Sequence, residues 1–293
     1  MKGHTITRAL GALGLATVAV AVSLAQPTQL AFWNFNESDP LDSTAMLAAD
    51  GGVFASQAQI SINLANIVYN NNGTGFRGSP LDPGTDGRNW ALQTTDYPAQ
   101  GQDSGMAGIV VSVPTTGYQN IVVKFDVRWS NTASKFLAVE YTTDGGANWT
   151  RARELQALRG DRWHGDTETN AGYGALVVLD LSGDSAVNNN AQFAFRVVTI
   201  FDPNTGTQYT AAQSGSNYST RGTLRYDLIE ILGEEASSGP EGDVNGDGCV
   251  DDADLLIVLF NFGNAGGQGD VNRDNIVDDA DLLVVLFNFG AGC

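Results

Sequence analysis

The sequence predicts a mainly β protein in which a jelly-roll β-sandwich precedes a small α-helical C-terminal domain. Two patterns predict this. Over residues 29–233, short apolar runs alternate with clusters of Gly, Asn, Thr and Ser, which is typical of an all-β domain. Further along, a 22-residue segment occurs twice, and each copy ends in an apolar block of helical length. We therefore expect the sandwich over residues 26–233, a linker over 234–241 and the repeat domain over 242–293.

Strand alternation is clearest over residues 120–129. The odd-numbered residues from Ile121 to Trp129 are apolar, whereas Lys124, Asp126 and Arg128 share the opposite face. One face should pack in the core, and the other should be wet or line a groove. Seven further strands are expected over 30–35, 90–94, 108–113, 136–142, 175–181, 192–200 and 223–232. About eight strands over some 200 residues suit one sandwich of jelly-roll type.

Residues 1–25 are predicted to be a secretory signal peptide. Lys2 and Arg8 form a basic start, residues 10–22 an apolar core, and Ser23-Leu24-Ala25 a small-residue cleavage site. An uncleaved membrane anchor is the alternative, but the apolar run is short for a bilayer span. No later segment is long and apolar enough to cross a membrane, so we expect the protein to be secreted or held at the cell surface.

The net charge of the chain indicates which classes of partner it can bind. The chain has 33 acidic and 15 basic residues, a formal net charge of −18. Such a charge disfavours nucleic acid as a partner and favours cations.

The two copies, residues 242–263 and 269–290, are identical at 18 of 22 positions. Each places oxygen ligands at positions 1, 3, 5, 7 and 12 of a calcium loop, position 7 through its main-chain carbonyl. The expected ligands are Asp243, Asn245, Asp247, Cys249 and Asp254 in the first loop, and Asp270, Asn272, Asp274, Ile276 and Asp281 in the second. A disordered acidic tail is the alternative. Position 6 requires a positive φ, which should strain Asn275 more than Gly248.

These repeats resemble the type I dockerin family over about residues 242–293. Position 12 is Asp rather than the Glu of general EF-hand loops, and no helix-like stretch precedes the first loop. The resemblance implies two calcium ions and docking onto a cohesin domain, with positions 10 and 11 helping to select the partner. These positions are Asp252 and Ala253 in the first copy and Asp279 and Ala280 in the second. Leu259, Phe260, Leu286 and Phe287 stand where many dockerins carry basic residues.

The blocks that follow the loops are apolar on all sides. A helix of this kind must be buried all round, yet a domain of about 52 residues has too little interior for two of them. Some of this surface should therefore dock onto a cohesin-like or other extracellular protein, onto the chain's own sandwich, or onto another copy in a surface fibre.

The two cysteines, Cys249 and Cys293, bracket the repeat domain. In an exported protein they are expected to form a disulfide. Two free thiols or an intermolecular bridge are the alternatives.

The middle of the chain looks similar to jelly-roll modules of exported bacterial proteins that accompany carbohydrate-active enzymes, which implies a bacterial source and glycan binding. Trp163 and Tyr173 flank its longest strand-free stretch and are the candidate sugar-stacking residues. Modules of this kind often hold a calcium ion, for which Asp39, Asp42, Asp82 and Asp86 are nearby oxygen donors. Residues 141–149 look like a hairpin similar to the Asp-box of sialidases, with Thr142, Asp144, Gly146 and Trp149 in the corresponding positions; we expect it to be structural.

Two hypotheses for function follow. The first is an exported, non-catalytic binding or assembly protein. The second is a polysaccharide-degrading glycoside hydrolase, which would need two carboxylates. The candidates are Glu140, Glu154, Glu168 and Glu230, and His164 is the histidine that a nucleophile would need. We expect Glu140 and Glu230 to point to solvent and His164 to be exposed in a loop, which favours the first hypothesis.

Overall fold

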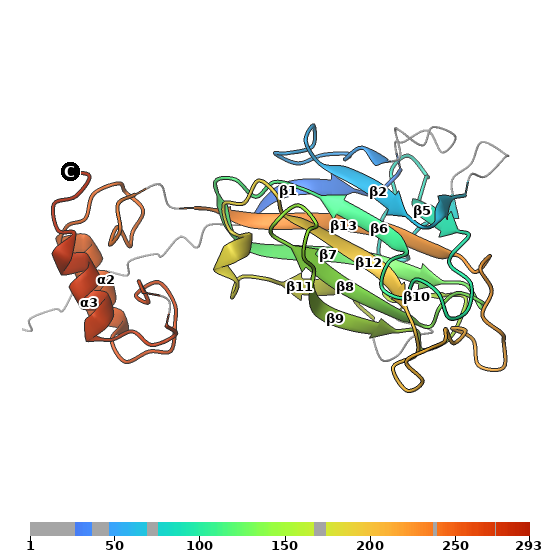
Figure 1. The fold of residues 1–293 in the computed structure, drawn as a ribbon. Coiled ribbons are helices and arrows are strands. Elements are labelled where there is room, and N and C mark those ends of the chain that lie inside the picture. Colours follow the sequence, from blue (N-terminus) through green and yellow to red (C-terminus); the bar gives the residue numbers. More distant parts are fainter. Residues whose placement is uncertain (1–26, 37–46, 69–75, 167–173, 237–238, 273) are drawn as a thin grey trace, which may run out of the picture.

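A computed structural model describes residues 27–36, 47–68, 76–166, 174–236, 239–272 and 274–293. It is mainly β, with two antiparallel sheets and two C-terminal helices, which confirms the predicted fold class (Figure 1). The main strands are β1 (Thr28–Trp33), β2 (Gln59–Asn63), β5 (Trp90–Thr95), β6 (Gly108–Ser112), β7 (Tyr118–Trp129), β8 (Phe136–Thr142), β9 (Thr150–Gln156), β11 (Val177–Asp180), β12 (Ala194–Ile200) and β13 (Leu224–Glu235). Three two-residue strands are β3 (Asn66–Ile67), β4 (Phe76–Arg77) and β10 (Arg162–Trp163), and a 3-10 turn covers Ser185–Val187.

The two sheets have different strand orders. The larger sheet runs β10-β7-β13-β5-β3, with β1 also paired to β13, β11 to β7 and β4 to β5. The smaller sheet runs β2-β6-β12-β8-β9. The two longest strands, β7 and β13, lie side by side in the middle of the larger sheet.

Each of the eight predicted strand segments contains a strand, but β2 and β9 were not predicted. In β9 every residue except Leu155 is exposed, so its sequence lacks the apolar alternation that marks a half-buried strand. It is paired through its main chain to β8 at the edge of the smaller sheet. Hydrogen bonding to a neighbouring strand, rather than its own side chains, holds β9 in place.

The core lies between the sheets and includes the alternating apolar residues of β7, each at most 1 % exposed. On the opposite face of β7, Lys124 and Arg128 are half-buried, as expected for a wet or grooved surface. Asp126 lies on that face too, yet it is fully buried. This exception marks the site described below.

The β8–β9 hairpin forms as predicted. The Thr142 hydroxyl donates to Asp144 Oδ1 at 2.7 Å, and the main-chain N–H groups of Gly146 and Asn148 donate to Thr142 Oγ1 at 3.1 Å and Asp144 Oδ1 at 2.9 Å. Hydrogen bonds led by the Asn148 N–H lower the pKa of Asp144 to about 2. The motif closes a turn, which agrees with a structural role.

The C-terminal domain has a core of its own. Helices α2 (Asp252–Asn261) and α3 (Asp279–Phe287) lie side by side and bury Val250, Val258, Val277 and Val285 completely (Figure 1). Asp251 and Asp278 cap the two helices in equivalent capping boxes. In the described part of the chain, no helix is both long and apolar enough to span a bilayer.

The N-terminal segment 1–25, with its predicted signal peptide, lies outside the described residues. Strand β13 continues to Glu235, two residues past the expected end of the sandwich.

Candidate functional site

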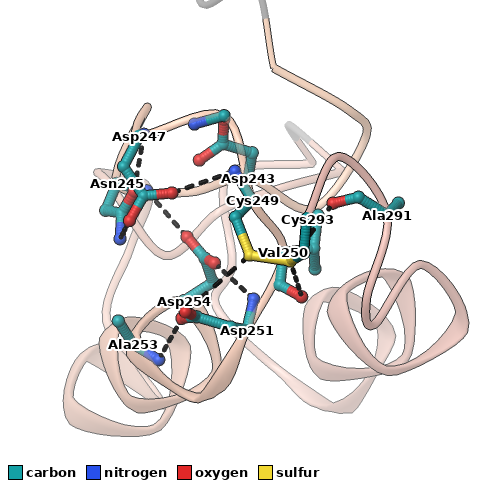
Figure 2. The surroundings of a disulfide bond; sticks show 11 residues. Asp243, Asn245, Asp247, Cys249, Val250, Asp251, Ala253, Asp254, Ala291 and Cys293 are labelled. Atoms are coloured by element: carbon teal, nitrogen blue, oxygen red, sulfur yellow. Dashed lines mark hydrogen bonds between the residues drawn. A yellow bond between two sulfur atoms is a disulfide. The ribbon is translucent and has the colours of Figure 1, made fainter.

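The first predicted calcium loop turns its polar side chains onto its own main chain (Figure 2). Asp243 accepts hydrogen bonds from the N–H groups of Gly246 and Gly248, both at 2.8 Å. Asn245 Oδ1 accepts from the Asp247 N–H at 2.8 Å, and Asp247 Oδ1 accepts from the Cys249 N–H at 2.9 Å. The loop therefore has the compact turn that a calcium loop needs.

The second loop repeats this arrangement. Asp270 accepts from the N–H of Asn275 at 2.9 Å, Asn272 Oδ1 from Asp274 at 2.9 Å, and Asp274 Oδ1 from Ile276 at 2.9 Å. Gly248 has φ 91° and Asn275 φ 71°. Both position-6 residues thus adopt the left-handed conformation that was predicted, which costs a side chain more than a glycine.

The position-12 aspartates, Asp254 and Asp281, are completely buried. Asp254 Oδ1 accepts from the Val244 and Asn245 N–H groups at 2.7 and 2.9 Å, and Oδ2 from the Asp251 N–H at 2.9 Å. Burial alone would raise the pKa of Asp281, but hydrogen bonds from its loop N–H groups hold that pKa below its ordinary value. Asp281 therefore stays ionised inside the domain, as a cation ligand must.

Calcium takes oxygen ligands, and each of the ten predicted ligands of the two loops can present a side-chain or main-chain oxygen. No three His, Cys, Asp or Glu side chains converge closely enough to hold a metal anywhere in the described residues. The loop carboxylates face main-chain N–H groups instead. The donor chemistry and turn geometry fit calcium, and the assignment of these ligands stays a prediction.

The predicted disulfide is confirmed. Cys249 is bonded to Cys293, with Cα atoms 4.7 Å apart (Figure 2). Next to this bond, the Val250 N–H donates to the Ala291 carbonyl at 2.9 Å, and the Gly290 N–H donates to the Val250 carbonyl at 2.8 Å. The end of the chain is thereby fixed onto the first loop, and neither cysteine is free.

The helices expose a large apolar surface in two matching copies. Phe260 is 82 % exposed and Phe287 83 %. The other pairs are close to half exposed and also match: Leu256 with Leu283, Leu259 with Leu286, and Phe262 with Phe289. We call these eight residues the apolar helix surface. The remaining predicted docking residues, Asp252, Ala253, Asp279 and Ala280, are exposed as well.

A groove lies on the outer face of the larger sheet, with a volume of about 550 Å³. Gln93 of β5, Arg225 of β13, Arg128 of β7 and Trp163 of β10 are successive cross-strand partners, so they form one row on this face. The groove is lined by Arg77, Gly78, Pro80, Leu81, Arg128, Trp163, Gly165, Asp166 and Arg225. We call it the arginine groove.

Trp163, one of the two predicted sugar-stacking residues, thus lines a real groove, although only 7 % of it is exposed. Tyr173 lies outside the described residues. Sequence reasoning missed Arg77 and Arg225, because β4, β7, β10 and β13 are far apart in sequence and only their pairing brings these residues together.

Buried carboxylates lie in the next row of the same face. Asp126 and Asp227 are direct cross-strand partners, both completely buried. Ser79 bonds both, its hydroxyl to Asp126 Oδ2 and its N–H to Asp227 Oδ2, each at 2.6 Å. Burial raises the pKa of Asp126 to about 6 and that of Asp227 to about 9. The loop between β4 and β5 therefore covers two carboxylates that are costly to ionise together.

A cluster of oxygen atoms lies under that loop. A Cβ added to Gly78 would meet Asn89 Oδ1, Asp227 Oδ2 and the Trp90 carbonyl oxygen, all within 2.6 Å. Asn89 Oδ1 is buried and has no hydrogen-bond partner among the described residues. Of these oxygens Asp227 Oδ2 accepts from the Ser79 N–H, whereas Asn89 Oδ1 is left for a donor or a hard cation such as calcium.

The four aspartates named from sequence for a calcium ion in the sandwich do not form this cluster. Asp82 is buried and accepts from Asn36 Nδ2 at 2.7 Å, whereas Asp86 lies exposed in a turn. Asp39 and Asp42 lie outside the described residues. Sequence reasoning placed Asp126 on a face expected to be wet or to line a groove, and it did not single out Asp227.

The expectation that Glu140 points to solvent is wrong. Glu140 is 6 % exposed and lies between two arginines, with Arg196 Nε 2.7 Å from Oε2 and Arg151 Nη2 3.1 Å from Oε1. Alternation placed it on the outer face correctly, but the long arginine side chains of the neighbouring strands cover it.

Among the other candidate catalytic residues, Glu154 lies near Glu140, because both carboxylates bond Arg151. Glu154 is exposed and pairs with Arg151, and Glu230 accepts from Gln29 at 2.8 Å. Glu168 lies outside the described residues. His164 is buried rather than exposed in a loop, and burial lowers its pKa.

Comparisons with known proteins identify no family. The sequence matches no protein-family model, and a search of curated proteins finds no similar sequence. Among solved structures, a two-module fragment of Clostridium thermocellum endo-1,4-β-D-xylanase 10B, with a family 22 carbohydrate-binding module, matches 75 % of this chain and 32 % of its own at 6 % identity and TM-score 0.38. The tandem family 22 modules of a Paenibacillus barcinonensis xylanase match 75 % and 53 % at 13 % identity and TM-score 0.36. The K3 cleaved adhesin domain of Porphyromonas gingivalis Lys-gingipain matches 69 % and 98 % at 10 % identity and TM-score 0.32.

This chain spans about a third and about half of the first two structures. Likenesses at this level determine neither the family nor the ligand of this chain.

Proposed function

We propose that this chain is an exported, non-catalytic binding and assembly protein. Its C-terminal domain docks onto a cohesin-like extracellular protein, and its β-sandwich contacts a glycan. The observation that carries the docking role is the apolar helix surface, on which Phe260 and Phe287 are each more than 80 % exposed. Fully burying a Phe side chain contributes about 1.5–3 kcal/mol, so this surface is a costly one to leave in water.

The internal repeat implies that the C-terminal domain can dock in two orientations. Each exposed residue of α2 has an equivalent on α3 with the same identity and nearly the same exposure. One partner site can therefore accept either copy, with the domain turned about its internal twofold. Under this proposal either helix alone supports binding.

Calcium has a structural part in this proposal. Two ions in the predicted loops would hold the acidic side chains of residues 243–254 and 270–281 and thereby fix the start of each helix. A third is proposed under the β4–β5 loop, supported by the buried Asn89 Oδ1 and the oxygen atoms around Gly78. Removing calcium should unfold the C-terminal domain and abolish docking.

Binding of the full chain to an immobilised, purified type I cohesin domain in calcium tests the docking role. The variants are Phe260→Ser, Phe287→Ser and the double change, and Val53→Ser, on a residue 54 % exposed in the sandwich, is the matched control. Each single variant and the control should bind within about threefold of the wild type, and the double variant should lose at least about 100-fold. A double variant that binds like the wild type, or a wild type that binds equally in EDTA, contradicts the proposal.

The arginine groove supports the second part, glycan contact, because it combines an indole ring with fixed hydrogen-bond donors in a hollow of ligand size. The glycoside hydrolase alternative loses its first candidate, since both carboxylate oxygens of Glu140 are bonded to arginines. The fibre alternative would appear as calcium-dependent high-mass species in light scattering.

A further inference from the structure

The arginine groove concentrates positive charge in a strongly acidic chain. The whole chain has a net charge of −18 and only 15 lysine and arginine residues. Three of those arginines line this one groove, and Asp166 is the single acidic residue among its described lining. The local charge of the groove is therefore opposite in sign to that of the molecule.

Two of the three arginines have no acidic partner among the described residues. Arg128 pairs with Asp161, but neither Arg77 nor Arg225 forms an ion pair there. Arg128 and Arg225 are also direct cross-strand partners, and like charges in that position destabilise a sheet. Burial and the charge of Arg128 lower the pKa of Arg225 to about 10. An anion bound between these side chains would relieve this repulsion.

The side chain of Arg225 is held in a fixed orientation by three contacts. Its Nε donates to Gln93 Oε1 at 2.6 Å, its Nη1 donates to the Arg77 carbonyl at 3.1 Å, and its guanidinium lies 5.0 Å from the centre of the Phe76 ring. These bonds use two of its five N–H donors. A guanidinium fixed in this way is suited to forked hydrogen bonds with a carboxylate or a sulfate.

The size of the groove limits the class of anion. A volume of about 550 Å³ is that of a small-molecule site and suits one or two sugar rings. A densely charged polymer such as nucleic acid would be repelled by the rest of the chain. A saccharide with separated acidic groups meets the local charge instead, because salt screens charges beyond about 8 Å at physiological ionic strength.

We propose that the arginine groove binds an acidic saccharide, whose uronate carboxylate or sulfate ester is held by Arg225 with Arg77 and Arg128 while a sugar ring lies beside Trp163. This inference rests on the proposed glycan contact of the sandwich and names its ligand class. It assigns Arg77 and Arg225, which come from the two strands β4 and β13, to one binding site.

Two matched pairs of polymers test the ligand class, using the full chain with calcium. Polygalacturonate is compared with its methyl ester, and dextran sulfate with dextran, by isothermal titration calorimetry. At least one charged polymer should bind about tenfold or more tightly than its neutral counterpart, and the pair that shows the difference identifies carboxylate or sulfate. Binding should weaken as salt is added.

Equal binding within both pairs overturns this inference and leaves the glycan contact standing. No binding to either charged polymer overturns it as well. If neutral xylan and glucomannan, added to the set, also fail to bind, the proposed glycan contact falls with it.

Three variants test the site itself. Arg77→Gln and Arg225→Lys should each weaken binding of the preferred charged polymer about tenfold, since the first removes a charge and the second removes the fork. Arg221→Gln, on an exposed residue that lines no part of the groove, is the matched control and should bind like the wild type. Tryptophan fluorescence on heating confirms that each variant is folded. Wild-type affinity in both groove variants overturns the proposal.

Discussion

Replacing Cys249 and Cys293 together by serine should unfold most of the C-terminal domain and leave the sandwich intact. The disulfide joins residues 44 apart in sequence, and the chain-entropy model gives about 4 kcal/mol for a closed loop of this length. A domain of about 50 residues has a total stability of roughly 3–5 kcal/mol. Its fully buried core is four valines, so little else can replace the loss.

Hydrogen exchange read by mass spectrometry on peptides from residues 242–293 measures this loss directly. All five tryptophans lie in the sandwich, so tryptophan fluorescence on heating serves as the internal control and should not change. In saturating calcium, which keeps the wild type folded, the double variant should lose about 4 kcal/mol of protection in these peptides. Each calcium ion at about 100 times its dissociation constant contributes about 2.7 kcal/mol to both proteins, so the two are compared at one calcium concentration.

The wild type treated with a thiol reductant should match the double variant, which separates loss of the bond from an effect of serine. Position 7 of the loop offers calcium only its main-chain carbonyl, so exchanging the side chain of Cys249 for that of serine removes no ligand. A difference in protection of less than about 1 kcal/mol between the wild type and the double variant in saturating calcium would refute the reasoning from loop closure.

Other predictions concern single residues. Glu140→Gln should destabilise the sandwich by about 2–3 kcal/mol in thermal unfolding, because it leaves Arg196 without its carboxylate; an unchanged midpoint would contradict this. The lowered pKa of Asp144 means that its contribution to hairpin stability is present above its unfolded pKa of 3.8 and is lost as pH falls through about 2. Exchange of the Asn148 amide between pH 5 and pH 2 should follow this loss, and Asp144→Ala should remove the dependence. Gly248→Ala should cost about 1–2 kcal/mol of domain stability. Gly248→Asn should cost less, because Asn275 already adopts the same left-handed conformation in the second loop. No atom lies within 4 Å of a Cβ added at Gly248, so the difference between the two variants measures backbone strain alone.

The strands that alternate could be predicted because one face of each is buried. Strand β7 is the clearest case, with every apolar residue from Ile121 to Trp129 in the core. Strand β9 could not be predicted, because it is held by main-chain pairing to β8 and has a single buried side chain. The repeat domain was predictable for a different reason, since its duplicated spacing fixes loops, caps and helices together.

The polar sites of the sandwich could not be predicted in the same way. Alternation placed Asp126 and Arg128 on the outer face of β7, which is where they lie. It could not indicate that the β4–β5 loop buries Asp126, or that Arg225 comes to lie opposite Arg128. Both facts depend on contacts between segments about 50 and about 100 residues apart, for which local sequence carries no signal.

The differences between the two repeats support docking over a merely structural role for the apolar helix surface. Three of the four differing positions lie in the loops, and the fourth exchanges Ile257 for Val284, both half-buried. All eight residues of the apolar helix surface are the same in both copies, although no core contact requires a phenylalanine that is more than 80 % exposed. If these positions only faced water, polar residues would serve there better, and the copies would be free to differ there first. A partner that uses either helix requires the same side chains on both. The same reasoning predicts the effect of exchanging Leu256, Leu259, Phe260 and Phe262 for polar residues in the first repeat alone. The domain should then dock in one orientation only. Paramagnetic or cross-linking distances to the partner should show a single bound geometry, where the wild type shows two.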